Sequence, residues 1–82
     1  MLKTVSVSVE DVYVPTGLRK ERDDSKVDEA AESLMEGEDI APIHVRKGKG
    51  RYVLIKGLHR LEAAKSLGEV TIDVFVIAAR KH

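Results

Sequence analysis

The fold of this chain is decided at residues 55–68, which read IKGLHRLEAAKSLG. A strand is predicted to end just before Gly57, where the backbone turns. A helix begins directly afterwards, at Leu58 or His59, and runs to Leu67 with the next glycine closing it. This unit of strand, glycine turn and helix organises the rest of the chain.

Basic side chains lie around the first turn of this helix, namely those of Lys56, His59 and Arg60. Backbone N–H groups at a helix start have no intrahelical partner, and the positive end of the helix dipole lies there. Cations are unfavourable at this position unless an anion binds beside them. The stretch therefore predicts an anion site, most plausibly for phosphate. The alternative is a plain tight turn at Gly57 with ordinary basic residues on the surface.

Composition narrows the classes of function. The chain has 82 residues and a formal net charge of zero at pH 7, so we expect one small domain with no overall field that attracts nucleic acid or anionic membrane. Without cysteine there is no disulfide, thiol nucleophile or cysteine–zinc site. No stretch resembles a membrane span or a signal peptide, and a cytoplasmic protein is expected. Aromatic residues are too scarce for a surface that stacks single-stranded bases.

Hydrophobic periodicity predicts strands and helices in mixed order, and hence an α/β (α+β) domain with two helices packed on a small mixed sheet. The strands are expected at residues 5–9 (continuing over 11–14 after a bend), 43–47, 52–56 and 70–77, and the helices at about 26–36 and 58–67. The longest and most apolar strand, 70–77, is predicted to be central. Ser25 is predicted to cap the first helix in a capping box with Asp28. The charged residues 18–24 are expected to form an exposed loop.

With this order in place, the chain resembles the ParB/sulfiredoxin-like family, which includes the N-terminal nucleotide-binding domain of ParB partition proteins. The segment 57–60, Gly-Leu-His-Arg, is similar to the family's Gly-Glu-Arg-Arg or Gly-Cys-His-Arg box. A second pattern, which in sulfiredoxins is Lys-Val, Leu and Pro-Ile-x-Val, is similar to an upstream part of this chain. The residues that resemble it are Lys26-Val27, Leu34 and the segment 41–45, Ala-Pro-Ile-His-Val. The resemblance extends from about Val5 to about Val76.

The resemblance implies a nucleotide site that takes ATP or CTP, with Mg²⁺. The backbone N–H groups at 57–59 and the side chains of His59 and Arg60 would bind the phosphates, with Lys26 and Arg19 facing them. The segment from Pro42 would support the base or sugar. The expected binding residues are Arg19, Lys26, Pro42, His44, Gly57, Leu58, His59 and Arg60.

Two departures from the family pattern limit what is carried over. Leu58 stands where sulfiredoxins have the nucleophilic cysteine and where ParB usually has glutamate, so sulfinic-acid reduction by that route is excluded. ParB proteins continue into a further nucleotide-contacting motif, a helix-turn-helix region and a dimerisation domain. We therefore expect 1–82 to be a single domain, either standing alone or cut from a longer protein.

Three kinds of function follow. The leading one is a nucleotide-gated switch or slow NTPase linked to DNA partition or to plasmid or phage maintenance. The alternative is a phosphoryl-transfer enzyme like free serine kinase, or a ParB-like nuclease. Catalysis would need carboxylates, and Glu32 and Glu36 are four apart on one helix face, although an ordinary solvated face is the favoured interpretation. Glu62 and Asp73 are further carboxylates, and the histidines lack zinc-ligand spacing.

The third kind is nucleic-acid binding through the basic hairpin around residues 46–51, for which a soluble turn is the favoured alternative. The expected partners are a nucleotide and a second copy in a homodimer. DNA would be reached through a partner or a missing domain, and no membrane is expected.

Overall fold

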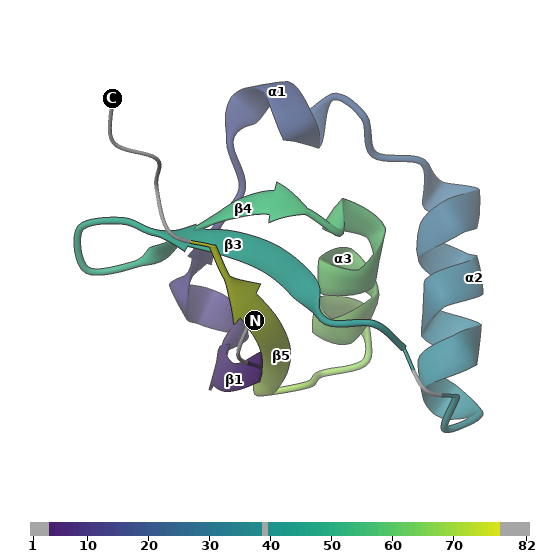
Figure 1. Cartoon of the computed structure of the whole chain (residues 1–82). Coiled ribbons are helices and arrows are strands. Elements are labelled where there is room, and N and C mark those ends of the chain that lie inside the picture. The colour runs from purple at the N-terminus through teal and green to yellow at the C-terminus, as the bar shows by residue number, and fades with distance from the viewer. Residues whose placement is uncertain (1–3, 39, 78–82) are drawn as a thin grey trace.

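The computed structural model describes residues 4–38 and 40–77. Its elements are β1 (Thr4–Ser8), the 3-10 turn η1 (Val9–Asp11), β2 (Val12–Tyr13), α1 (Thr16–Arg19), α2 (Asp24–Met35), β3 (Ile43–Lys47), β4 (Tyr52–Lys56), α3 (Leu58–Ser66) and β5 (Thr71–Val76) (Figure 1). The predicted mixed α/β domain is confirmed, and the strands at 43–47 and 52–56 have the predicted bounds. The last five residues, for which a polar tail was predicted, lie outside the described ranges.

The strands form one mixed sheet with the order β1-β5-β3-β4-β2. The hairpin pairs β3 with β4 antiparallel, and α3 then carries the chain across to β5, which runs parallel to β3. The central strand is therefore β3, and the prediction that 70–77 is central was wrong. Although β5 is the longest strand, the crossover through α3 places it one position from the middle, between β3 and β1.

The main core lies between one face of the sheet and α3. Leu61 of α3 is fully buried, and it is surrounded by Ile43, Val45, Leu54 and Val74 from the three inner strands. The second long helix, α2, packs against α3 and buries only Val27 completely. The molecule thus has three layers, which are the sheet, α3 and α2 (Figure 1).

The spacing of apolar residues 61, 64 and 67 in the sequence predicts one apolar face on α3, and the structure confirms most of it. Leu61 and Ala64 are buried, as their spacing predicts. Leu67 is 37% exposed, because α3 ends at Ser66, one residue before it. Leu58 and Ala63 are buried as well, so α3 is covered on more than one side. This follows from α2 and η1 lying against it in addition to the sheet.

Two predictions about the N-terminal third were wrong. α2 begins at Asp24, and its cap is Asp23, whose carboxylate accepts hydrogen bonds from the backbone N–H and hydroxyl of Ser25. Ser25 therefore lies inside the first turn, because a carboxylate two residues earlier takes the capping role. The segment expected as a loop at 18–24 also begins in the short helix α1, whose Leu18 packs against the core.

Residues 11–14 do not continue the first strand. The turn η1 redirects the chain after Ser8, and β2 pairs in parallel with β4 at the opposite edge of the sheet from β1. None of the helices in the described ranges combines the length and the apolar character that a membrane crossing requires.

Candidate functional site

The turn before α3 requires glycine on two counts. Gly57 has φ 109° and ψ 30°, a conformation that residues with a side chain rarely adopt. A Cβ atom at this position would lie only 2.6 Å from Cγ2 of Ile43. The turn is therefore pressed against the start of β3. No side chain caps α3, so the N–H groups of its first turn are left to other acceptors.

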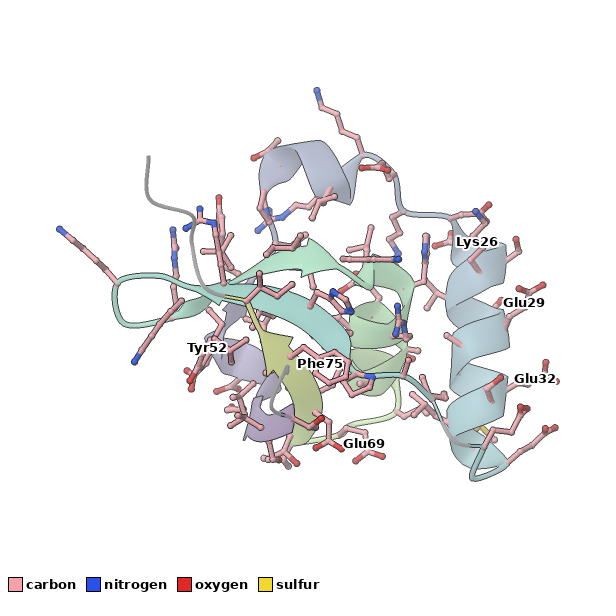
Figure 2. All side chains as sticks on the ribbon, in the orientation of Figure 1. Lys26, Glu29, Glu32, Tyr52, Glu69 and Phe75 are labelled. Atoms are coloured by element: carbon pink, nitrogen blue, oxygen red, sulfur yellow. The ribbon has the colours of Figure 1, made fainter. Side chains whose placement is uncertain are left out.

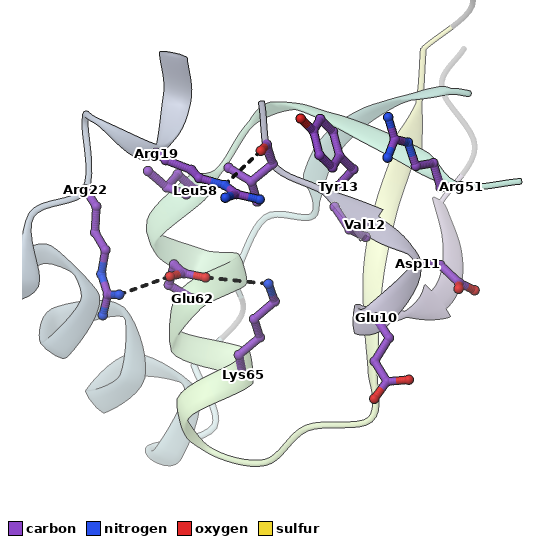
Figure 3. A pocket seen from close by; sticks show the side chains of 11 residues that line it. Glu10, Asp11, Val12, Tyr13, Arg19, Arg22, Arg51, Leu58, Glu62 and Lys65 are labelled. Atoms are coloured by element: carbon purple, nitrogen blue, oxygen red, sulfur yellow. Dashed lines mark hydrogen bonds and ion pairs between the residues drawn. The ribbon is translucent and has the colours of Figure 1, made fainter. Parts of the chain in front are cut away.

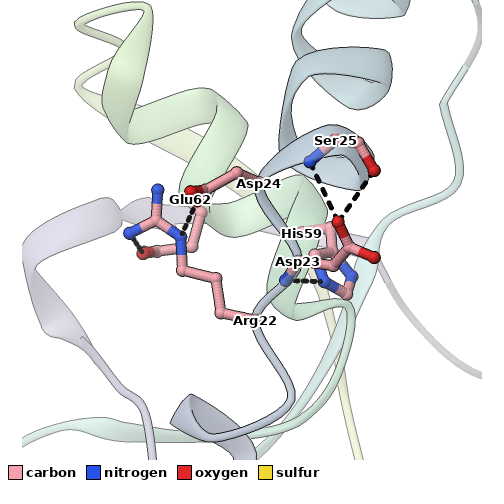
Figure 4. A network of polar contacts seen from close by, with 6 residues as sticks. All are labelled: Arg22, Asp23, Asp24, Ser25, His59 and Glu62. Atoms are coloured by element: carbon pink, nitrogen blue, oxygen red, sulfur yellow. Dashed lines mark hydrogen bonds and ion pairs between the residues drawn. The ribbon is translucent and has the colours of Figure 1, made fainter.

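His59 joins the start of α3 to the start of α2. Its Nε2 accepts a hydrogen bond of 3.0 Å from the backbone N–H of Asp23, the residue that caps α2 (Figure 4). Hydrogen bonds from the side chain and then the backbone of Ser25 lower the pKa of the Asp23 carboxyl. Lys26 stands exposed in the first turn of α2. Two helix N-termini therefore lie side by side, with their positive dipole ends converging.

Arg60 fixes the connector that leads into β3. Its Nη1 donates hydrogen bonds to the backbone oxygens of Ala41, at 2.6 Å, and Pro42, at 3.1 Å. The same guanidinium lines a cavity of about 290 Å³ between this connector, α2, α3 and the start of β5. Because Nη1 makes both bonds, the N–H groups on Nε and Nη2 are still available to a ligand.

A larger cavity, of about 500 Å³, lies along another side of α3. From α3 it is lined by Leu58, Glu62 and Lys65, which are spaced to share one helix face. Glu62 forms ion pairs with Lys65, at 3.7 Å, and with Arg22, at 3.2 Å (Figure 3). The pair with Arg22 ties α3 to the segment between α1 and α2, whereas the pair with Lys65 lies within α3.

The upper wall of this cavity is built on Tyr13 (Figure 3). The guanidinium of Arg51 lies 3.9 Å from the Tyr13 ring centroid, and that of Arg19 lies 5.8 Å from it, so both make cation–π contacts. Arg19 is also held by a 3.1 Å hydrogen bond from its Nε to the backbone oxygen of Val14.

The predicted site residues lie in four places. Gly57, His59 and Lys26 lie around the two helix N-termini, and Arg60 is bonded to Pro42.

Arg19 and Leu58 instead line the larger cavity, where Leu58 is only 7% exposed. His44 alternates away from the buried Ile43 and Val45, and its ring packs edge-to-face on Phe75 with centroids 5.4 Å apart.

Sequence reasoning did not predict that Arg22, Tyr13 and Arg51 help to form a cavity. Arg22 stands in a highly charged run that is typical of a solvated loop, and Arg51 stands beside a hairpin turn. One signal was available, because Leu58, Glu62 and Lys65 recur at four and three residues on a single helix face.

Metal ligands do not gather in the part of the chain that the structure describes. There, no three His, Cys, Asp or Glu side chains lie close enough to hold a metal ion. Glu32 on α2 and Glu36 at its C-cap are both exposed, as their interpretation as solvated carboxylates requires.

Comparison with known proteins places this geometry in a family. Residues 3–82 match the ParB N-terminal domain family. Over 58 residues the chain is 41% identical to the probable chromosome-partitioning protein ParB of Campylobacter jejuni, a match that covers 71% of this chain and 21% of that protein. The chain therefore spans about a fifth of the length of this curated relative.

Solved structures share the fold. Sulfiredoxin from Arabidopsis thaliana superposes with a TM-score of 0.82 at 28% identity, covering 94% of this chain and 86% of that one. The C-terminally truncated ParB of Caulobacter crescentus, complexed with CTP-gamma-S, superposes with a TM-score of 0.80 at 22% identity, covering 96% of this chain and 46% of that one. The chain therefore belongs to the ParB N-terminal domain family and has the ParB/sulfiredoxin-like fold.

Proposed function

We propose that this domain binds a nucleoside triphosphate, ATP or CTP, with the phosphates at the paired N-termini of α2 and α3. The observation that carries the proposal is the hydrogen bond from Asp23 N–H to His59, which holds the two helix starts together. The uncapped N–H groups of α3, with the start of α2 beside them, favour a polyanion. Family membership and a ParB relative complexed with CTP-gamma-S support the same ligand.

The predicted residues that lie near the helix starts then have roles that their positions allow. The backbone N–H groups of Leu58 and His59, exposed by the turn at Gly57, donate to phosphate oxygens. The Lys26 ammonium adds charge from α2. The remaining N–H groups of Arg60 reach a phosphate or sugar oxygen, while its Nη1 holds the Pro42 connector in place to support the base.

Mg²⁺ fits this arrangement as an ion that arrives with the nucleotide. In proteins Mg²⁺ keeps several waters and is held chiefly by phosphates with one or two carboxylates. The nearest acidic candidates at the helix starts are Asp23 and Asp24. Mg²⁺ would neutralise phosphate charge next to those carboxylates, which would otherwise repel the ligand.

The output we propose is a nucleotide-gated switch that serves DNA partition or plasmid or phage maintenance. The relative from Campylobacter jejuni is a probable chromosome-partitioning protein, and this chain corresponds to about a fifth of it. Nucleotide bound at the helix starts would hold the segment around Asp23 against α3, and a second copy or another domain would sense that closed form. Slow hydrolysis is the accompanying alternative, and analysis of products after long incubation with nucleotide tests for it.

Calorimetry with ATP, CTP and ADP, with and without Mg²⁺, tests the proposal. We expect at least one triphosphate to bind, and absence of binding at millimolar concentration would overturn the proposal. Lys26→Gln should weaken binding by about tenfold, the loss of one charge-assisted contact. Lys20→Gln, which removes the same charge from an exposed position outside the site, should leave the affinity unchanged.

Arg60→Lys separates the two roles of Arg60. A lysine keeps the charge but cannot bond two carbonyls and a ligand with one planar group. If Arg60 contacts the ligand, Arg60→Lys should bind the nucleotide more tightly than Arg60→Ala. The two variants should lose the same folding stability, because neither can form both bonds to the connector. Equal affinity in wild type and Arg60→Ala would remove Arg60 from the site.

A further inference from the structure

The net charge of zero conceals a strong separation of charge along the chain. Between Asp39 and Glu62 the sequence has no acidic residue. Residues 46–56 hold five basic side chains, Arg46, Lys47, Lys49, Arg51 and Lys56. Since the chain has 14 basic and 14 acidic residues, the rest of it carries nine basic against 14 acidic. The β3–β4 hairpin is therefore a local cationic segment on a domain that is otherwise acidic.

The tip of this hairpin projects from the sheet. β5 pairs with β3 only as far as Val45, and β2 pairs with β4 only at Tyr52 and Val53. The loop between the strands extends past its neighbours, and side chains with nitrogen ends project from it (Figures 1 and 2). Arg46, Lys47 and Lys49 are exposed, and none of the three forms an ion pair among the described residues.

The base of the hairpin is anchored while the tip stays cationic. Arg51 is held on the ring of Tyr13, with 3.9 Å between the guanidinium carbon and the ring centroid. Two carboxylates lie near this base: Asp11 lines a small cavity with Lys47 and Arg51, and Glu10 lines the larger cavity with Arg51. Neither Asp11 nor Glu10 forms an ion pair within the described part of the chain. The positive charge at the tip is thus left for a partner.

Acidic charge gathers at the other end of the molecule. Residues 21–39, which include α2, contain nine acidic and two basic residues. Glu29 and Glu32 lie along the outer side of α2, across the molecule from the hairpin (Figure 2). The longest dimension is 40 Å, several times the screening length of about 8 Å at physiological salt. A polyanion at the hairpin therefore experiences little repulsion from α2.

We propose that the β3–β4 hairpin docks on the phosphate backbone of duplex nucleic acid without reading its sequence. Lysine and arginine at the tip supply the contacts that make phosphate binding strong and dependent on salt. The loop 48–51 has no aromatic residue to stack on unpaired bases, which disfavours a single strand. The inference goes beyond nucleotide binding and does not rest on it, because the hairpin tip lies outside the helix N-termini.

Fluorescence anisotropy of the full chain with two short labelled DNA duplexes of unrelated sequence tests the proposal. Both duplexes should bind with the same affinity. With three or four phosphate contacts, raising salt from about 50 to about 200 mM should weaken binding by roughly 60-fold. The double variant Lys47→Gln/Lys49→Gln should lose most of the binding and reduce this salt effect to a few-fold.

The matched control is Lys20→Gln, set against the single hairpin variant Lys49→Gln, because each removes one charge from an exposed lysine that forms no ion pair among the described residues. Lys20→Gln should bind DNA like the wild type, whereas Lys49→Gln should bind it more weakly. Both single variants and the double variant should keep the wild-type affinity for nucleotide, if nucleotide binds, and the wild-type midpoint in urea, which shows that they are folded. Equal loss of DNA binding in Lys20→Gln and Lys49→Gln would overturn the proposal.

The proposal is also overturned if the hairpin variant binds DNA normally but loses a salt-dependent self-association in analytical ultracentrifugation. In that case the hairpin's partner is the acidic α2 of a second copy.

Discussion

At the scale of single residues, Gly57 combines a positive φ with a close approach to Ile43. We expect Gly57→Ala to destabilise the domain by about 3 kcal/mol, because backbone strain of about 1–2 kcal/mol adds to a steric clash of similar size. Gly68→Ala is the matched control, since Gly68 has φ 75° with no atom within 4 Å of an added Cβ. Urea denaturation should show a loss of only about 1 kcal/mol for the control. Equal losses would mean that the contact with β3 is unimportant.

Asp23 makes the stability of α2 depend on pH. The pKa of its carboxyl is lowered from about 3.8 by the hydrogen bonds from Ser25, so the stabilisation is fully present above that value and is lost as pH falls through the lower folded pKa. Asp23→Asn keeps an acceptor but not the charge. Urea midpoints of wild type and Asp23→Asn should differ at pH 6, and the difference should shrink as the pH falls below about 3.8. Parallel profiles over that range would show that Asp23 does not cap α2 as a carboxylate.

At the scale of elements, α3 joins the core to both cavities. Leu61 is fully buried between this helix and the sheet, so Leu61→Ala should cost about 3 kcal/mol through the cavity that it leaves. Leu67→Ala, one turn and a half further on, removes the same atoms from a side chain that is 37% exposed and should cost less than about 1 kcal/mol. Thermal and urea unfolding measure both. Comparable losses would place the helix differently on the sheet.

The elements also show how much of the fold can be predicted from the sequence. Strands 43–47 and 52–56 and helix α3 follow from local periodicity, because their alternation and their glycine boundaries are written in neighbouring residues. The position of β3 at the centre depends on which strands pair, and pairing involves residues far apart in the chain. The candidate site likewise has one part that could be predicted from the sequence and one part that could not. The turn at Gly57 was predictable, whereas the bond from Asp23 to His59 spans 36 residues and has no local signal.

At the scale of the whole molecule, ligand binding should increase the free energy of unfolding. A nucleotide that binds only the folded domain at 100 times its dissociation constant adds about 2.7 kcal/mol. We therefore expect the Tm to rise with ATP or CTP concentration in differential scanning fluorimetry. His59→Ala, which removes the bridge between the helix starts, should reduce that rise. A full rise in the variant would show that the two N-termini need not be held together.

The layering of the molecule has a consequence for its motions. α2 is the outer layer on α3, its one buried side chain, Val27, lies outside the main core cluster, and its Leu34 is only partly buried against that cluster. Less apolar surface therefore holds α2 in place than holds the sheet. Such a helix can detach and return as a cooperative unit while the sheet stays intact. Amide protons of α2 should then exchange with deuterium well before those of β3. Occupation of the helix starts by a phosphate ligand should slow exchange in α2 first, making this outermost helix the reporter of the bound state.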